Sequence, residues 1–383
     1  MGRMYAALLA IGLCASATAR SGEARMTMTD LFTHQGKDWY RIPSLVVSPK
    51  GVVLAFASRR KGSVGDFGHD TDVVLRRSLD SGLTWQPMQT LASRSGIDIH
   101  HGPAVVNRKT GRVLKFCRFW PARAKGGPRA FVNGTPYTRM KELGYLDHVL
   151  WSDDEGATWT QPAPLPLPFP EGAISCATGN GSHGIQLADG RLLIQGGCVV
   201  DGTRHDCIFA SDDGGSSWQR GATAAVGGSL REFGMAELAD GSVYCNVRAR
   251  GGHRKIARST DRGMSFANVA TEKALADPFC HAGLVRMTAV AGAPPRLFFS
   301  NPTHGRTRLT LRMSRDEGRS WPVARVVHEG PAAYSDLAIL PDGTVGCLFE
   351  RGTKSPYEAV AFARIPLEWL TVAHGGAGNG DGP

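Results

Sequence analysis

The chain has 383 residues, with 48 Gly, 22 Pro and a formal net charge of +10. This composition, with few long patterns of helical period, argues against a helical or βαβ chain and favours one large all-β domain of short strands. The positive charge suits an anionic partner, either nucleic acid or acidic carbohydrate. Because the basic residues stand in ones and twos without interleaved aromatics, nucleic acid is the weaker of the two.

Residues 1–19 have the pattern of a signal peptide. A basic start is followed by a short apolar run and then by small residues that end at Ala19. Cys14 raises the alternative of a lipoprotein, but Leu13 is too large for the residue before a lipidated cysteine. We therefore expect a secreted or periplasmic protein without a transmembrane segment, with one domain over 26–370 and a disordered tail over 371–383.

A turn motif of the form SxDxGx(T/S)W recurs along the chain. Five copies stand roughly fifty to seventy residues apart, and each follows a short apolar strand: SLDSGLTW at Ser78, SDDEGATW at Ser152, SDDGGSSW at Ser211, STDRGMSF at Ser259 and SRDEGRSW at Ser314. In such a turn the short polar side chains bond to the local backbone, and glycine accepts a positive φ. One copy is an ordinary hairpin turn, whereas five copies indicate a repeat architecture.

Clusters of strands around these motifs predict six units, over residues 41–86, 101–161, 182–219, 232–266, 281–321 and 335–365. The last unit has no turn motif, and residues 26–32 are expected to supply its last strand. This arrangement predicts a six-bladed β-propeller of four-stranded antiparallel blades, closed so that no long sheet edge is exposed. Residues 121–145 are expected to form a long loop within the second unit.

Cysteine and histidine spacing gives no metal site, because no CxxC or HExxH pattern occurs. No cofactor is expected, and nothing in the sequence supports a structural calcium ion. If Cys14 is removed with the signal peptide, seven cysteines remain. Cys198 and Cys207 flank a turn and form the one candidate disulfide across a hairpin.

The function of a propeller lies at the mouth where its inner strands begin, so charged and aromatic residues at early positions of the units are the candidates for the site. These residues, with Asp66 in the loop of the first unit, are Arg41, Glu232, Arg248, Arg306, Tyr334 and Glu350.

The segments that contain these residues resemble the exo-sialidases, which are retaining glycosidases that remove terminal sialic acid. YRIPS with AFASRR resembles the opening RIP strand and the strand after it, and LREFGMAELADGSVYCNVR resembles the glutamate-to-arginine segment. FFSNPTHGRTRLTLRMS resembles the segment of the third arginine, and AAYSDLAILPDG resembles the tyrosine segment. The resemblance runs from Tyr40 to the FARI motif at Phe362. Within the family, the chain is most similar to the bacterial and lysosomal-type branch.

The resemblance implies a role for each candidate. Three arginines bind the substrate carboxylate through paired hydrogen bonds, Tyr334 is the nucleophile, and Glu232 draws off its proton. Asp66 is the general acid and base, which implies an acidic pH optimum. Glu350 braces the first arginine, and a further arginine lines the carboxylate side. The arginines are Arg41, Arg248 and Arg306 of the triad, with Arg60 as the further one.

Several assignments have rivals. Arg308 and Arg312 lie close to the third arginine, Asp70 and Asp72 lie close to the acid, and His101 and His183 either border the sugar pocket or are structural. Ser58 stands where many relatives carry Glu. Asn133 and Asn180 fit glycosylation sequons, without meaning if the source is bacterial.

Three functions fit the pattern. The first is hydrolysis of sialylated glycans by an exo-α-sialidase. The second is transfer of sialic acid by a trans-sialidase, which sequence cannot separate from hydrolysis. The third is binding of sialoglycans without turnover, which we consider weaker because the tyrosine, its glutamate and the acid are all present.

Overall fold

The computed structural model describes residues 25–122, 147–168, 171, 173–200, 203–224, 226, 228–288 and 294–371. The expected signal peptide, nearly all of the expected long loop, Asn133 and the tail beyond Thr371 lie outside these ranges. Within them the fold is all-β, and the only helix is the short α3 (Leu367–Thr371). No helix in this part of the chain is long and apolar enough to cross a membrane.

The strands form four hydrogen-bonded sheets. The first contains β2 (Asp38–Val47), β3 (Val53–Lys61), β4 (Thr71–Ser78), β5 (Gln89–Ala92), β6 (Ile97–Val106), β7 (Val113–Pro121), β8 (Asp147–Ser152) and β9 (Ala163–Pro164). The second contains β10 (Ala173–Thr178), β11 (Ile185–Gln186), β12 (Leu192–Val200), β13 (Thr203–Ser211) and β14 (Gln219–Arg220). The third contains β15 (Gly228–Glu237), β16 (Val243–Ala249), β17 (His253–Ser259) and β18 (Ala267–Ala276). The fourth contains β1 (Thr27–Thr33), β19 (Gly283–Met287), β20 (Arg296–Pro302), β21 (Thr307–Ser314), β22 (Val323–Ile339), β23 (Val345–Arg351) and β24 (Ala359–Ile365).

The sequence predicted six separate sheets, and two continuous connections account for the difference. Strand β22 has 17 residues and serves two units, because its first half pairs with β21 and its second half pairs with β23. The first two units are joined by one parallel pair between Thr71 and Asp98. The expected place of the N-terminal strand is confirmed, since β1 pairs antiparallel with β24.

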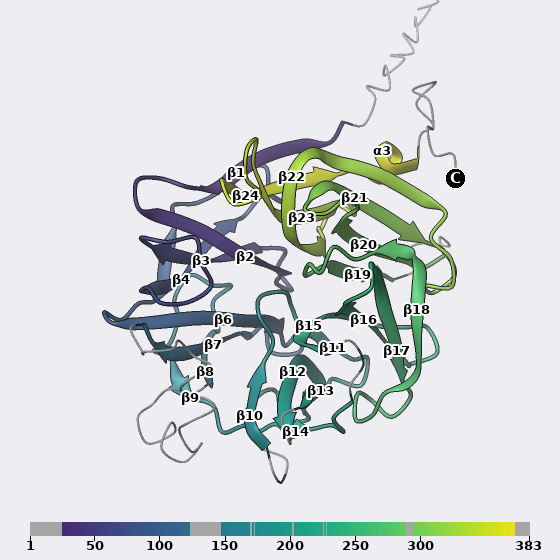
Figure 1. The fold of residues 1–383 in the computed structure, drawn as a ribbon, viewed down its shortest axis with the longest axis horizontal. Coiled ribbons are helices and arrows are strands. Elements are labelled where there is room, and N and C mark those ends of the chain that lie inside the picture. The colour runs from purple at the N-terminus through teal and green to yellow at the C-terminus, as the bar shows by residue number, and fades with distance from the viewer. Residues whose placement is uncertain are drawn as a thin grey trace, which may run out of the picture.

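The sheets follow one another around the middle of the molecule (Figure 1). The inner strands contact one another in chain order, and the last contacts the first: β2, β6, β12, β15, β19 and β22. Hydrophobic clusters fill the spaces between consecutive units. Leu54 of the first unit packs in one cluster with Val106 of the second, and Leu348 of the last unit packs in another with Val53 of the first. The core is therefore distributed between the sheets.

The five turn motifs adopt the hydrogen bonding that the sequence predicts. In the first, the Ser78 hydroxyl donates to Asp80 Oδ1 at 2.7 Å and accepts from the Gly82 amide at 2.7 Å, while the Thr84 amide donates to Asp80 Oδ1 at 2.8 Å. The same bonds recur at Ser152, Ser211, Ser259 and Ser314.

These turns also hold neighbouring units together. Gly82 has a φ of 82°, and a Cβ at this position would lie 2.3 Å from the Phe362 ring in β24. Gly156 has a φ of 77°, and its Cβ would lie 2.4 Å from Leu54 in β3. Glycine is required at both positions because the backbone is left-handed and the preceding unit packs directly against it. The turns are thus contacts between neighbouring units.

The predicted disulfide between Cys198 and Cys207 is wrong. Across the β12–β13 hairpin Cys198 lies opposite His205, whereas Cys207 lies opposite Gly196. The two sulfurs are 3.9 Å apart, too far for a bond of about 2.0 Å. The register of the hairpin therefore separates the pair that the turn between them had suggested.

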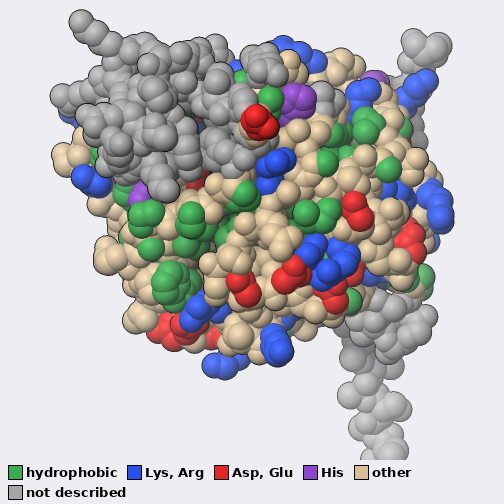
Figure 2. Space-filling view, turned by 90° about the horizontal axis from the view of Figure 1, so that it is seen from below, with side chains coloured by type: hydrophobic (Ala, Val, Ile, Leu, Met, Phe, Trp, Pro, Cys, Tyr) green, Lys and Arg blue, Asp and Glu red, His purple; other side chains and the backbone are tan. Residues whose placement is uncertain are grey.

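Charges of both signs are mixed on the face shown in Figure 2, where Lys and Arg side chains lie beside Asp and Glu side chains. Several surface arginines are paired. Arg112 donates to both carboxylate oxygens of Asp153, at 2.7 and 2.8 Å, and Arg351 binds Asp30 in the same way at 2.8 and 2.7 Å.

Candidate active site

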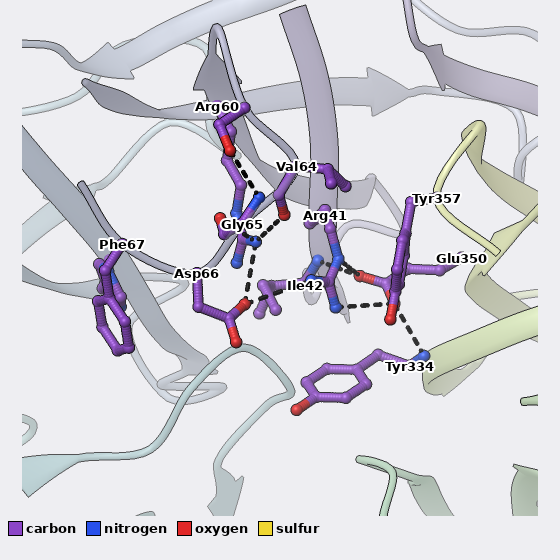
Figure 3. A network of polar contacts seen from close by, with 12 residues as sticks. Arg41, Ile42, Arg60, Val64, Gly65, Asp66, Phe67, Tyr334, Glu350 and Tyr357 are labelled. Carbon is purple, nitrogen blue, oxygen red and sulfur yellow. Dashed lines mark hydrogen bonds and ion pairs between the residues drawn. The ribbon is translucent and has the colours of Figure 1, made fainter. Parts of the chain in front are cut away.

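Arg41 lies on a bulge in β2, where the register against β3 shifts between Arg41 and Ser44. The next residue, Ile42, has a φ of 61°, which is unusual for a β-branched side chain. A bulge bends the strand and re-aims side chains, and here it brings Arg41 beside Glu350. The guanidinium donates from Nε to Glu350 Oε1 at 2.9 Å and from Nη2 to Oε2 at 3.4 Å. Figure 3 shows this pair beside Tyr334.

Glu350 is fully buried and also fixes the backbone at two other points of the site. The Ile42 amide donates to its Oε1 at 2.8 Å, and the Tyr334 amide donates to its Oε2 at 3.1 Å. One carboxylate therefore joins β2, β22 and β23. The expectation that Glu350 and Arg41 lie together agrees with this geometry.

Tyr334 comes from the second half of β22, and its phenol meets side chains from β15 and β16. The hydroxyl donates to Glu232 at 2.9 and 3.0 Å and accepts from Arg248 Nη1 at 2.7 Å. Arg248 also pairs directly with Glu232. Burial and the negative charge of Glu232 raise the pKa of the Tyr334 phenol well above its ordinary value. The phenol is therefore neutral at neutral pH, with its proton directed at a carboxylate.

Three arginines converge on the ring of Tyr334. The Cζ atom of Arg306 lies 5.5 Å from the ring centroid, that of Arg41 lies 5.7 Å away and that of Arg248 lies 5.9 Å away. Arg41 lies in β2, Arg248 lies in β16 and Arg306 lies in the turn between β20 and β21, so segments from three sheets contribute to the cluster. Such a cluster of guanidinium groups is suited to binding a carboxylate.

The rival arginines are placed elsewhere. Arg308 is half exposed, and its Nε lies 3.5 Å from Glu329. Arg312 lies within β21 opposite Phe299. Of the three arginines in this segment, Arg306 is the one that lies over the Tyr334 ring.

Asp66 lies in the loop between β3 and β4, at the edge of the arginine cluster. Its Oδ1 accepts from Arg60 Nη1 at 3.0 Å and from Arg41 Nη1 at 3.3 Å, and its side chain remains 63% exposed. Arg60 also donates to the carbonyls of Val64 and Gly65, at 2.8 Å each, so it holds the loop as well as the acid. Burial raises the pKa of the Asp66 carboxyl, but the charges of Arg60 and Arg41 outweigh it and lower that pKa below its usual value.

The rival acids have other partners. Asp72 is buried and pairs with Arg59 and Lys61. Asp70 accepts the Gly96 amide at 3.1 Å. Neither is bonded to an arginine of the cluster, so the geometry favours Asp66.

The two histidines have structural contacts. His101 is buried and donates to the Ile42 carbonyl, which supports the bulge, and burial lowers its pKa well below the ordinary value. His183 pairs with the buried Asp336 at 2.8 Å. Burial lowers the pKa of His183, but the adjacent carboxylate raises it by more, so the net shift is upward. Ser58 is buried in β3 opposite Arg41.

Sequence reasoning missed two aromatic residues that complete the cluster. The Tyr357 ring lies 4.0 Å from Arg41 Cζ, and its hydroxyl accepts from Arg306 Nη1 at 2.6 Å. The Phe279 ring lies 3.6 Å from Arg248 Cζ, and its carbonyl accepts from Arg306 Nη2 at 3.3 Å. Both residues stand in irregular segments that carry no motif, so no signal in the sequence pointed to them.

The residues that the structure describes contain no group of three or more His, Cys, Asp or Glu side chains that could hold a metal ion.

The fold and the site define a class: an all-β repeat protein with a cluster of arginines built around a tyrosine and a glutamate. Residues 52–347 match the family model described as BNR repeat-like domain, and the chain belongs to that family. The curated relatives to which it is similar are named sialidases or exo-alpha-sialidases.

The sialidase of Micromonospora viridifaciens is 34% identical over 369 residues, which cover 91% of this chain and 55% of that protein. The chain thus spans about half the length of this relative. Among solved structures, the Hadza microbial sialidase Hz136 is 27% identical with a TM-score of 0.77, covering 87% of this chain and 66% of that one. The intramolecular trans-sialidase from Ruminococcus gnavus shares the fold, with 19% identity, a TM-score of 0.72, and coverage of 90% of this chain and 97% of that one.

Proposed function

We propose that this protein is an exported exo-α-sialidase, which hydrolyses terminal sialic acid from sialylated glycans with retention of configuration. The observation that carries the proposal is the convergence of Arg41, Arg248 and Arg306 on Tyr334, whose phenol donates to Glu232. Sialic acid bears a carboxylate on its anomeric carbon, so an enzyme for it needs a fixed anion site directly beside a nucleophile.

The sheet arrangement supports the finer fold proposal of a six-bladed β-propeller. Six units surround one centre, the inner strand of the last contacts that of the first, and β1 completes the last unit by pairing with β24. In this interpretation the four sheets are six blades, of which two pairs are joined by continuous hydrogen bonding.

In the proposed first step the carboxylate of the sugar binds the three arginines. The Tyr334 oxygen attacks the anomeric carbon while its proton passes to Glu232, and Asp66 gives its proton to the leaving oxygen as the glycosidic bond breaks. A neutral phenol is a suitable nucleophile here because the substrate carboxylate would repel an attacking carboxylate.

In the second step Asp66 takes a proton from water, the resulting hydroxide attacks the anomeric carbon, and the bond to Tyr334 breaks. The phenolate then recovers its proton from Glu232. Two displacements at the same carbon give retention, so the sugar should be released first as the α-anomer.

The test uses a fluorogenic sialoside with the wild type, Tyr334→Phe and the control Tyr244→Phe. Tyr244 is buried in β16, where it packs in a hydrophobic cluster with Leu284 and Leu297, so its variant removes a buried hydroxyl from the core. We expect Tyr334→Phe to lose at least about a thousandfold in kcat, since nucleophilic chemistry is lost, and Tyr244→Phe to keep most of its activity. Equal rates for the wild type and Tyr334→Phe would contradict the proposed nucleophile.

Transfer and binding are separated from hydrolysis in the same assay. Incubation with a sialoside and lactose gives free sialic acid from a hydrolase and sialyllactose from a trans-sialidase. Binding of the sialoside without release of product would indicate a sialoglycan-binding module instead.

A further inference from the structure

We propose that Arg254 is a positioning residue that holds two arginines of the cluster, Arg248 and Arg306, in the arrangement that binds the substrate carboxylate. This inference rests on the proposed function and extends it to a cation that does not itself meet the substrate. It begins from a charged side chain that the structure buries completely.

Arg254 lies in β17 and has no exposed surface. A guanidinium loses much hydration when it is buried, so it is stable there only where its donors find acceptors. Its Nε donates to the Asn246 side chain at 2.6 Å, and its Nη2 donates to the Asn246 carbonyl at 3.1 Å. Its Nη1 donates to Asp277 Oδ2 at 3.0 Å and to the Cys280 carbonyl at 2.9 Å. One side chain therefore joins β16 to residues 277–281, which lie between β18 and β19.

The carboxylate of Asp277 adds to this connection, and its side chain is also fully buried. Its Oδ2 accepts the Ala249 amide at 2.8 Å, and its Oδ1 accepts the Cys280 amide at 3.0 Å. Ala249 directly follows Arg248 in β16. The buried ion pair therefore fixes the backbone beside Arg248 as well as residues 277–281.

Residues 277–281 connect this ion pair to the cluster of arginines. The Phe279 ring lies 3.6 Å from Arg248 Cζ, and the Phe279 carbonyl accepts from Arg306 Nη2 at 3.3 Å. Phe279 has a φ of 55°, an uncommon left-handed conformation that persists only where surrounding contacts determine it. The bonds that Arg254 makes to this segment are such contacts. A shift of Arg254 would therefore move the ring beside one arginine and the carbonyl that binds the other.

Arg254→Lys separates the charge from the geometry. Lysine keeps the positive charge that the buried Asp277 requires, but its single ammonium group cannot replace the planar fork that reaches two segments at once. A displacement of about 1 Å at a reacting site can lower the rate by about a hundredfold. We expect Arg254→Lys to lower kcat/KM for a fluorogenic sialoside by about ten- to a hundredfold.

Binding is measured separately from turnover by calorimetry with the 2,3-unsaturated analogue of sialic acid, which carries the same carboxylate. For Arg254→Lys we expect the Kd of this analogue to rise about tenfold, the equivalent of about one hydrogen bond to a charged group. The matched control is Arg191→Lys. Arg191 is also buried, binds both oxygens of Asp212 and donates to the Arg262 carbonyl at 3.3 Å, so it joins the third and fourth turn motifs. This control should keep the wild-type Kd and kcat/KM.

A double-mutant cycle with Arg306→Lys shows whether Arg254 acts through the cluster. The effects of independent sites add, whereas residues that act through one another give effects that do not add. We therefore expect Arg254→Lys to weaken binding of the analogue much less in the Arg306→Lys background than in the wild type. An equal loss in both backgrounds, an unchanged Kd, or the same loss in the control would each refute the positioning role.

Two further measurements keep the test decisive. Midpoints of thermal unfolding show whether each variant folds. If Arg254→Lys does not fold, Asn246→Ala takes its place in the cycle, because it removes one bond of Arg254 and keeps the ion pair with Asp277. If the wild type binds the analogue but releases no sialic acid, the proposed function fails while the cycle on Kd still decides the role of Arg254. If the wild type does not bind the analogue, both proposals are wrong.

Discussion

Replacing Glu350 with glutamine tests how strongly the site depends on one buried carboxylate. Glu350 is fully buried and accepts four hydrogen bonds, two from Arg41 and one each from the amides of Ile42 and Tyr334. Glutamine has nearly the same shape, so the substitution removes the charge and one acceptor without opening a cavity.

The loss of stability expected for Glu350→Gln follows from these contacts. The longer bonds are at Oε2, 3.4 Å from Arg41 and 3.1 Å from the Tyr334 amide, so the new NH₂ group should take that end and face two donors. A buried donor without an acceptor costs about 1–3 kcal/mol. Removing one member of a buried ion pair costs about 3–5 kcal/mol in total. We expect Glu350→Gln to lower the free energy of unfolding by about 3–5 kcal/mol.

Urea unfolding followed by fluorescence measures this loss, since the free energy of unfolding falls linearly with denaturant. Asp153→Asn is the matched control, because Asp153 also binds an arginine through both oxygens but is 58% exposed. An exposed pair contributes less than about 1 kcal/mol. If both variants change stability by the same small amount, Glu350 does not hold a buried charge, and the account of the Arg41 brace is wrong.

Three further predictions follow from particular residues. Gly156→Ala should destabilise the fold by about 1–3 kcal/mol more than Gly190→Ala. Both glycines have a positive φ, but only a Cβ at Gly156 would meet a neighbour, at 2.4 Å. Equal free energies of unfolding for the two variants in urea would contradict this prediction. Burial lowers the pKa of Lys115 to about 7, so the unfolded chain binds more protons between that pH and about 10.5, and this contribution to stability rises with pH. The wild type should therefore gain stability relative to Lys115→Met across this range, and a constant difference would refute it. Because Arg60 and Arg41 lower the pKa of Asp66, the acid loses its proton early and kcat/KM for a sialoside should fall as pH rises from acid to neutral, in contrast to a flat profile.

The local parts of the fold were predictable because they are encoded in short segments. Each turn motif contains its own donors and acceptors, so Ser78 and Asp80 bond as the pattern requires without help from the rest of the chain. The joining of two units through β22 was not predictable. Gly330 and Pro331 interrupt the alternating pattern and suggest a loop, yet the strand continues, because Pro331 pairs with Thr307 at a shift in register that tolerates the missing amide.

The candidate site likewise contains residues that the sequence predicts and residues that it does not. Arg41, Glu232 and Tyr334 stand in motifs that a family resemblance can carry, and the structure brings them together. Tyr357 and Phe279 contact the arginines only through the folding of irregular segments, and no local pattern marks such residues. The wrong disulfide has the same cause, since the hairpin register depends on pairings that the turn alone does not specify.

The contact between Asp66 and Arg41 connects substrate binding to the protonation of the acid. Without a substrate, the positive charges of Arg60 and Arg41 stabilise the ionised form of the Asp66 carboxylate, which keeps its pKa low. In the proposed function a bound carboxylate competes for the same Arg41 N–H and brings its own negative charge. Both effects weaken the stabilisation of the charged form, so the pKa of Asp66 should rise when the site fills. An acid that is 63% exposed and ionised in the free protein can then donate a proton in the complex, because the ligand itself supplies the change in environment. Its protonation depends on binding an anion, and for that reason a neutral sugar would leave the acid without its proton.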